Sequence, residues 1–182
     1  MAIYVASGAV LIILAYLLVM YNSFVKLRNS VKEAFSTMDV YLKMRWDLIP
    51  NLVEVVKGYV NHEREVLERV TELRSMPYDN LSYSDKININ EKLSAGLGKL
   101  MVVVENYPDL KASRHFTELG LQLSKVEDDI SNARKYYNAV VKNMNNHVEM
   151  FPGNVVAKLF GFSQYPFFEA QAGERDNVKV GL

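Results

Sequence analysis

The chain contains no cysteine, so disulfides, thiolate nucleophiles and metal centres with cysteine ligands are excluded. Neither sign of charge is in excess, because 21 Lys and Arg side chains balance 21 Asp and Glu side chains. A neutral chain has no general electrostatic attraction for nucleic acid, so we expect none as a partner. Hydrophobic residues make up 49% of the 182 residues, which is enough to fill the core of one domain.

The sequence signatures of several common active sites are also missing. None of the three histidines belongs to the Glu-x-x-His motif of di-iron helical bundles. The stretch 62–66 begins like a zinc-protease helix, but Val66 stands where the second histidine is required. There is no glycine-rich phosphate loop and no G-x-S-x-G elbow. We therefore expect no enzymatic activity, no metal and no cofactor.

Residues 1–20 contain no charged side chain, and residues 10–19 are an almost unbroken aliphatic run. A bilayer core of ~30 Å needs about 20 helical residues, which this segment supplies. A buried core helix normally keeps a polar face, and this segment has none. A cleaved signal peptide begins with basic residues and ends at small ones, and neither feature occurs here. We predict an uncleaved transmembrane signal-anchor helix over residues 1–21.

Basic residues follow this apolar segment and predict its orientation. Lys26, Arg28 and Lys32 lie just after it, whereas only the α-amino group precedes it. The positive-inside rule then places the rest of the chain in the cytoplasm and the N-terminus outside. Tyr16 and Tyr21 suit the membrane interface at that end. We expect a single-pass protein of the cell membrane, with the lipid bilayer as one partner.

After the anchor, apolar residues recur at spacings of three and four, which is typical of amphipathic helices. The fold class predicted is all-α, an antiparallel up-and-down four-helix bundle over residues 22–152. The anchor is expected to continue without a break into the first bundle helix. The apolar positions are Val31, Phe35, Met38, Leu42, Ile49, Leu52, Val56, Tyr59, Val66, Val70 and Leu73, then Leu93, Leu97, Leu100, Val104 and Tyr107, then Phe116, Leu119, Leu123, Val126, Ile130, Ala133, Tyr137, Val140, Met144, Val148 and Phe151.

Two prolines are expected to mark corners between helices. Residues 47–50 are interpreted as the first corner, with Asp47 as a helix cap and Pro50 in the first turn of the next helix. A kink at Pro50 in one long helix is the alternative, because the heptad phase continues through it. Residues 105–110, around Pro108, form the second corner, and residues 76–90 are predicted as a loop.

With these boundaries, the first and last helices of the predicted bundle differ in length. Residues 22–47 would span ~39 Å and residues 113–150 ~57 Å at the rise of an α-helix. The longer helix must therefore bend, fray or extend beyond the bundle.

An aromatic segment follows the last bundle helix. Residues 153–168 form this segment, and its five aromatic residues cap the end of the core in one interpretation. In the other they contact the membrane interface or a protein partner. Residues 169–182 are polar and are predicted to be a flexible tail. The five aromatics are Phe160, Phe162, Tyr165, Phe167 and Phe168.

One charged residue, Arg45, falls on the apolar face of the first helix. A charge on the core side must be paired, or its burial costs several kcal/mol. A structural ion pair is one interpretation, and a binding site at the membrane-distal tip is the other. The residues of this candidate polar cluster are Asp39, Arg45, Asp47, Asn51, Glu105, Asn106 and Tyr107.

Short motifs occur along almost the whole chain. They are YN at 21–22, VKLRN at 25–29, DVYLK at 39–43, DLIPNLVE at 47–54, VKGY at 56–59, ENYPDLKA at 105–112, AR at 133–134, YN at 137–138, FP at 151–152, GF at 161–162, FEA at 168–170 and VKV at 178–180. Taken in this order, these motifs resemble those of the LemA family of bacterial membrane proteins. Phe35 stands where the family usually has Trp, Tyr41 where Gln is common, and Met44 replaces one of a basic pair before Arg45.

The resemblance implies a single-pass protein with a four-helix domain facing the cytoplasm, and no catalytic residues to carry over. Some family members are associated with envelope stress and a membrane metalloprotease, others with intracellular membrane compartments. We expect a membrane-anchored, non-enzymatic scaffold or adaptor of the bacterial envelope, because long amphipathic faces offer grooves for a protein partner or for self-association. The alternative is a membrane-remodelling protein that assembles laterally. A third hypothesis, an enzyme at the distal corners, requires a pocket with perturbed pKa values.

Overall fold

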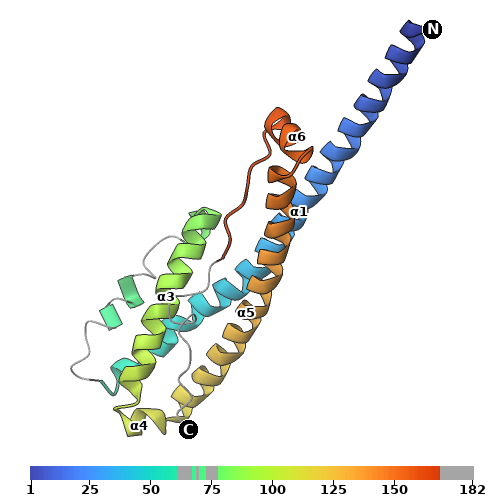
Figure 1. Ribbon diagram of the computed structural model, residues 1–182. Coiled ribbons are helices and arrows are strands. Elements are labelled where there is room, and N and C mark those ends of the chain that lie inside the picture. The colour runs from blue at the N-terminus through green and yellow to red at the C-terminus, as the bar shows by residue number, and fades with distance from the viewer. Residues whose placement is uncertain (61–66, 69, 73–77, 169–182) are drawn as a thin grey trace, which may run out of the picture. The chain divides into compact units, whose positions relative to one another are not determined.

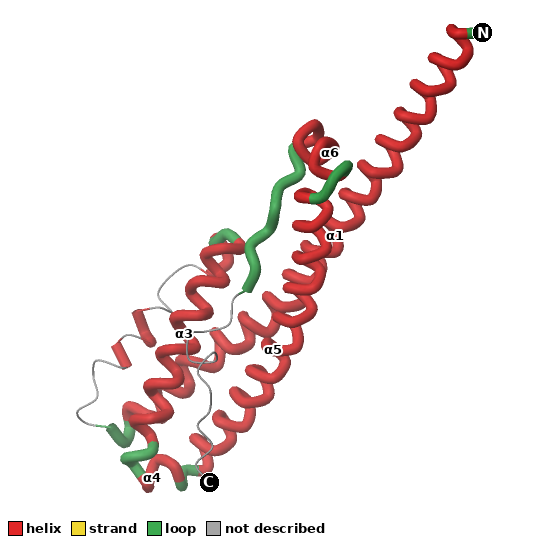
Figure 2. The backbone as a smooth tube through the Cα atoms, in the orientation of Figure 1, coloured by secondary structure: helices red, strands yellow, loops and turns green. Residues whose placement is uncertain are grey.

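The computed structural model describes residues 1–60, 67–68, 70–72 and 78–168, and every regular element within these ranges is helical. This confirms the all-α class for the described part of the chain. Figure 2 shows the short turns that join α3 to α4 and α4 to α5. The elements are α1 (Ala2–Lys57), the 3-10 turn η1 (Tyr78–Asn80), α3 (Tyr83–Val104), α4 (Pro108–Lys111), α5 (Arg114–Glu149) and α6 (Gly153–Phe160), labelled in part in Figure 1.

Helix α1 is 56 residues long and has no break between its apolar start and its amphipathic continuation. The predicted continuity of the apolar segment with the amphipathic helix that follows it is therefore confirmed. The apolar part has a mean hydropathy of 2.5 over 18 residues, and none of that window is buried. By length and composition, α1 could cross a membrane.

The predicted corner at residues 47–50 is wrong, because Pro50 lies inside α1 and the helix ends at Lys57. Asp47 is accordingly an interior helical residue and not a cap. The helix continues because Ile49 and Leu52 stay on its buried face, at 1% and 3% exposure. From Asn22 to its end, α1 is thus as long as α5, which has 36 residues. The predicted difference in length disappears.

The break at Pro108 is confirmed. Helix α3 ends at Val104, and Pro108 occupies the first turn of α4, where its missing N–H costs nothing. The predicted loop over 76–90 is wrong from Tyr83 onward, since α3 begins there. The Ser82 hydroxyl caps α3 by accepting the Asp85 backbone N–H at 3.2 Å. Met76 and Pro77 lie outside the described residues.

The chain forms two compact units. The first comprises residues 1–38 and 133–167, and the second comprises the described residues between 39 and 132 together with Phe168. In the first, the buried apolar residues are Phe24, Val31, Ala34, Phe35, Met38, Ala133, Tyr137, Val141, Met144, Val156 and Ala157. In the second, they include Leu42, Trp46, Ile49, Leu52, Val53, Val56, Leu67, Val70, Leu93, Leu97, Leu100, Val104, Phe116, Leu123, Val126 and Ile130.

Most predicted core positions are buried. Leu119, in the second turn of α5, is only half-buried, and the other exceptions lie at helix ends or late in α5. Tyr59 and Phe151 are 44% and 82% exposed, because each follows the end of its helix. Late in α5 the buried residue is Val141 and not the predicted Val140. A heptad repeat drifts against the 3.6-residue turn of a straight helix, which explains this shift in a long helix. Val66, Leu73 and the predicted tail from residue 169 lie outside the described residues.

Replacing Pro50 by alanine tests the continuous helix. Pro50→Ala should raise the free energy of unfolding by about 1–3 kcal/mol, because an interior proline removes a backbone hydrogen bond and strains the preceding turn. Pro108→Ala is the matched control and should give no gain, since proline suits a first turn. Denaturant titration of the full chain in detergent measures both changes. A loss of stability in Pro50→Ala would favour a corner.

Candidate functional site

The second unit contains a buried polar network centred on Arg45, whose side chain has no solvent exposure. Arg45 Nη1 donates to Ser94 Oγ at 2.6 Å and to the two carboxylate oxygens of Glu127 at 2.9 and 3.1 Å. Arg45 Nη2 donates to the backbone oxygen of Asn90 at 3.0 Å and to its Oδ1 at 2.7 Å. We call Arg45, Asn90, Ser94 and Glu127 the Arg45 network. It ties α1 to α3 and α5 within this unit.

The α3 members of the network are held in place by their own helix. Lys86, Asn90 and Ser94 are spaced by four residues, which puts them on one face of α3. Asn90 Nδ2 donates to the Lys86 backbone oxygen at 2.8 Å, and Ser94 Oγ donates to the Asn90 backbone oxygen at 3.1 Å. These bonds hold the Asn90 and Ser94 oxygens that accept hydrogen bonds from the Arg45 guanidinium.

Electrostatics make the network indispensable once Arg45 is buried. The Glu127 side chain is 39% exposed, so solvent screens its half of the ion pair. Arg45 is not screened by solvent. Its charge is compensated by the two Glu127 carboxylate oxygens, the two Asn90 oxygens and the Ser94 hydroxyl. Within the described residues, its Nε–H has no acceptor. The arrangement is therefore a structural clamp whose loss would leave buried polar groups without partners.

A second polar group, built on Asp39, adjoins this network. Lys86 Nζ lies 2.6 Å from Asp39 Oδ2, and the Tyr78 hydroxyl donates to Asp39 Oδ1 at 2.8 Å. Asn90 Nδ2 lies 3.3 Å from the Tyr78 hydroxyl and so connects the two groups. Burial raises the pKa of Tyr78, and the negative charge and hydrogen bond of Asp39 raise it further. Tyr78 therefore stays protonated as a donor.

The seven residues of the predicted polar cluster do not contact one another as one group. Asp39 and Arg45 belong to the connected groups described above. Asp47 pairs with Lys43 at 2.9 Å, and Glu105 pairs with Lys111 at 2.6 Å, all four side chains being largely exposed. The remaining three are Asn51, which lines a groove, Asn106, which is exposed, and Tyr107, which precedes α4. The prediction that these residues form one cluster depended on a corner at Pro50. Because α1 continues through Pro50, that corner does not exist.

Sequence reasoning missed the true partners of Arg45. Reading residues 76–90 as a loop hid the row of Lys86, Asn90 and Ser94. Their spacing of four residues, with apolar neighbours between, was the available signal. Glu127 directly follows the buried Val126, and nothing in the sequence distinguishes it from the acidic residues beside it.

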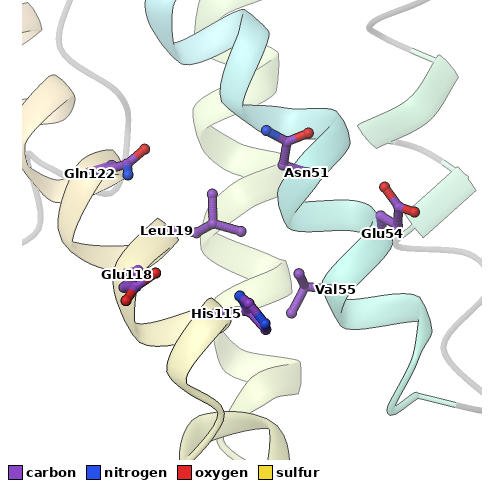
Figure 3. A pocket seen from close by; sticks show the side chains of 7 residues that line it. All are labelled: Asn51, Glu54, Val55, His115, Glu118, Leu119 and Gln122. Atoms are coloured by element: carbon purple, nitrogen blue, oxygen red, sulfur yellow. The ribbon is translucent and has the colours of Figure 1, made fainter.

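An open groove of about 440 Å³ lies between α1 and α5 in the second unit. Figure 3 shows its lining side chains, which come from both helices. Glu118 also accepts a hydrogen bond from Arg114 Nε at 2.8 Å. Two carboxylates and an imidazole suit a cationic group better than an anion. In the described part of the chain no three His, Asp or Glu side chains are grouped to hold a metal ion. The lining residues are Asn51, Glu54, Val55, His115, Glu118, Leu119 and Gln122.

In the first unit, aromatic residues near the C-terminus pack on α1. The Phe162 ring stacks on Phe24 with centroids 4.8 Å apart, and the Arg28 guanidinium lies 5.6 Å from its centroid. Phe160 meets Tyr21 edge-on at 5.0 Å but is still 47% exposed. Two of the five predicted aromatics thus contact α1.

The other three predicted aromatics differ in exposure. The Tyr165 backbone exchanges two hydrogen bonds of 2.9 Å with the Asn145 side chain. Phe167 is 45% exposed, whereas Phe168 is only 1% exposed. The interpretation that the aromatic residues cap the core therefore applies to Phe168. Phe160 and Phe167 are exposed enough to make other contacts.

Comparison with known proteins shows which family the chain belongs to. A model of the LemA family matches residues 34–181. The chain belongs to the LemA family. The family resemblance of the sequence motifs is thereby confirmed.

Three relatives are similar to this LemA-family chain over most of its length. Protein LemA of Metamycoplasma hominis is 26% identical over 158 residues, covering 86% of this chain and 72% of the relative. Magnetosome protein MamQ 2 of Paramagnetospirillum magneticum is 25% identical, covering 91% and 71%. Magnetosome protein MamQ of Magnetospirillum gryphiswaldense is 22% identical, covering 87% and 68%.

Substitution of Arg45 tests the clamp. Arg45→Ala should lower the free energy of unfolding by about 3 kcal/mol, because the Asn90 oxygens lose their donors inside the core. The free energy of unfolding of Arg45→Lys should lie between those of the natural chain and of Arg45→Ala. The lysine ammonium cannot reach both Asn90 and Glu127 as the planar guanidinium does. Denaturant titration of the full chain in detergent measures both.

The control for these variants is Arg114→Ala. The Arg114 side chain is 89% exposed and pairs with Glu118 in solvent, so no measurable change is expected. Equal, small effects of Arg45→Ala and Arg114→Ala would contradict the clamp.

Proposed function

We propose that this protein is a membrane-anchored, non-enzymatic scaffold of the bacterial envelope, with its N-terminus outside and its helical body in the cytoplasm. The observation that carries the proposal is the unbroken α1, whose apolar start leads directly into the packed residues Phe24 and Val31. Lys26, Arg28 and Lys32 after the apolar run support the orientation. An antiparallel up-and-down four-helix arrangement of the body fits the helix lengths and the turn at Pro108.

The groove between α1 and α5 is the surface we propose for a protein partner. Glu54, Glu118 and His115 line it, so a basic helix or segment complements its charge. The lining also includes the apolar Val55 and Leu119, which give a partner side chain something to pack against. Peptide helices bind in grooves of this kind through a few apolar anchors.

The buried polar groups support a scaffold over an enzyme. Inside the second unit, Lys86 pairs with Asp39, and Arg45 is bound by Asn90 and Glu127. None of Asp39, Arg45 and Lys86 lines the groove. A catalytic group instead has to face a space that substrate can enter. The groove does hold His115, but among the described residues no hydrogen bond joins its imidazole to Glu54 or Glu118 as a catalytic base is joined to its nucleophile.

Lateral organisation of a membrane is the second candidate function. Two of the relatives are named magnetosome proteins, and the chain has a row of exposed apolar residues near α6. A scaffold that self-associates while attached to lipid would perform this role as well. The two functions differ in the partner: another copy of the chain for membrane organisation, and a different protein for an adaptor.

Photo-crosslinking in native membranes tests the scaffold. A benzophenone amino acid at Gln122, which lines the groove, should give a covalent adduct with another protein or with a second copy. Mass spectrometry of the adduct distinguishes the two. The matched control is Ser124, an exposed position on a different face of α5. Absence of adducts at both positions, or equal labelling at both, would contradict a partner in the groove.

A further inference from the structure

Helix α6 and the turn before it expose an unusual number of large apolar side chains. Phe151 is 82% exposed, Leu159 65%, Met150 64%, Val155 56% and Phe160 47%. We call these five residues the α6 outer face. They lie within eleven consecutive residues of the chain, and Lys158 is exposed beside them.

The exposure is not a consequence of poor packing. The opposite side of α6 is well buried, with Val156 and Ala157 each at 2%. Gly153 lies so close to the His147 backbone oxygen that any side chain there would collide with it. Gly161 ends the helix in a left-handed conformation, with φ 72°. Helix α6 is thus held firmly against α5, with its apolar outer face turned outward.

A short surface helix normally presents polar residues to water on its outer side. Here Val155 and Leu159 occupy much of that side, and the polar side chains of α6 are only Asn154 and Lys158. Contiguous exposed apolar residues mark a contact with a protein or a membrane. The position of α6 on the chain decides between them.

The rings after and within α6 lie beside the end of the apolar run of α1. Tyr21 directly follows that run, and its ring lies 5.0 Å from Phe160 and 5.8 Å from Phe162. Figure 1 shows α6 beside α1 where α1 continues alone towards the N-terminus. The outer face is therefore at the level where α1, if it spans the bilayer, leaves the hydrocarbon.

The charged and aromatic residues near α6 also suit the boundary between hydrocarbon and headgroups. Amphipathic tyrosines and snorkelling lysines are favoured at the boundary between hydrocarbon and headgroups. Tyr21 stands at the end of the apolar run, and Arg28, further along α1, lies over the Phe162 ring. Lys158 on α6 would face the lipid phosphates while Val155 and Leu159 enter the acyl boundary.

We propose that the α6 outer face is a second membrane contact, which lies in the lipid interface beside the α1 span. The occupant is the bilayer itself, because the face is continuous through Phe160 and Tyr21 with the segment that enters it. This inference rests on the proposed membrane anchoring. It moves the membrane-contacting surface from the aromatics at Phe162 and Phe168 to the preceding residues Met150, Phe151, Val155 and Leu159.

The chain has no cysteine, so single nitroxide labels can be placed without altering any other residue. Leu159→Cys and Val155→Cys report on the outer face, and both side chains are exposed enough to tolerate a label. Leu14→Cys reports on the apolar run, and Ser124→Cys on a water-exposed face of α5. The labelled full chain is reconstituted into vesicles of phosphatidylethanolamine and phosphatidylglycerol. Electron paramagnetic resonance then measures collisions with oxygen and with a water-soluble nickel chelate.

The labels at Leu159 and Val155 should collide with nickel several-fold less than the label at Ser124, and should collide readily with oxygen. Leu14 should show the same pattern more strongly. If the label at Leu14 collides little with nickel but the labels at Leu159 and Val155 collide with it as often as the label at Ser124, the inference about α6 is wrong and the membrane anchoring by α1 is still supported. Shielding of Leu159 and Val155 from both reagents would mean that protein covers the face, which also overturns it. Nickel access at Leu14 would overturn the anchor and, with it, the inference.

Discussion

The unbroken backbone of α1 is the constraint on which the rest of the structure depends. A helix satisfies its own peptide groups, so one segment can enter hydrocarbon and continue into a protein core without a connecting loop. The apolar run ends at Met20, and Phe24 is already fully buried four residues later. In the proposed anchoring, membrane attachment and packing of the first unit are therefore properties of one helix. Tyr21, Phe24 and Phe162 contact one another where the exposed apolar run of α1 gives way to its buried continuation.

In the second unit, a fully buried arginine sets which helical residues face one another. Arg45 requires acceptors at defined positions, and α3 and α5 supply them through Asn90 and Glu127. An apolar contact would tolerate small shifts in register, whereas a guanidinium fork does not. The Asp39 group adds a second constraint through Tyr78 and Lys86. These polar contacts account for a charged residue on an otherwise apolar face.

Periodicity made the helices and most of their buried residues predictable, because spacing of three and four directly reflects the helical turn. It did not decide whether Pro50 ended a helix, since the cost of an interior proline competes with burial of Ile49 and Leu52, and that burial depends on distant residues. The partners of Arg45 were unpredictable for the same reason. Asn90 and Glu127 lie 45 and 82 residues away, and only the folded arrangement selects them. The groove at Asn51 and His115 also depends on two helices far apart in sequence.

Hydrogen exchange of the full chain in lipid nanodiscs tests the central claim, the continuity of α1 from membrane to core. Amides between Leu18 and Lys32 should exchange slowly and without a gap, because each N–H is hydrogen-bonded within a helix that is held at both ends. Mass spectrometry of overlapping peptides measures the rate for each segment. Fast exchange around Tyr21 and Asn22, between two protected segments, would show a flexible joint and contradict the account.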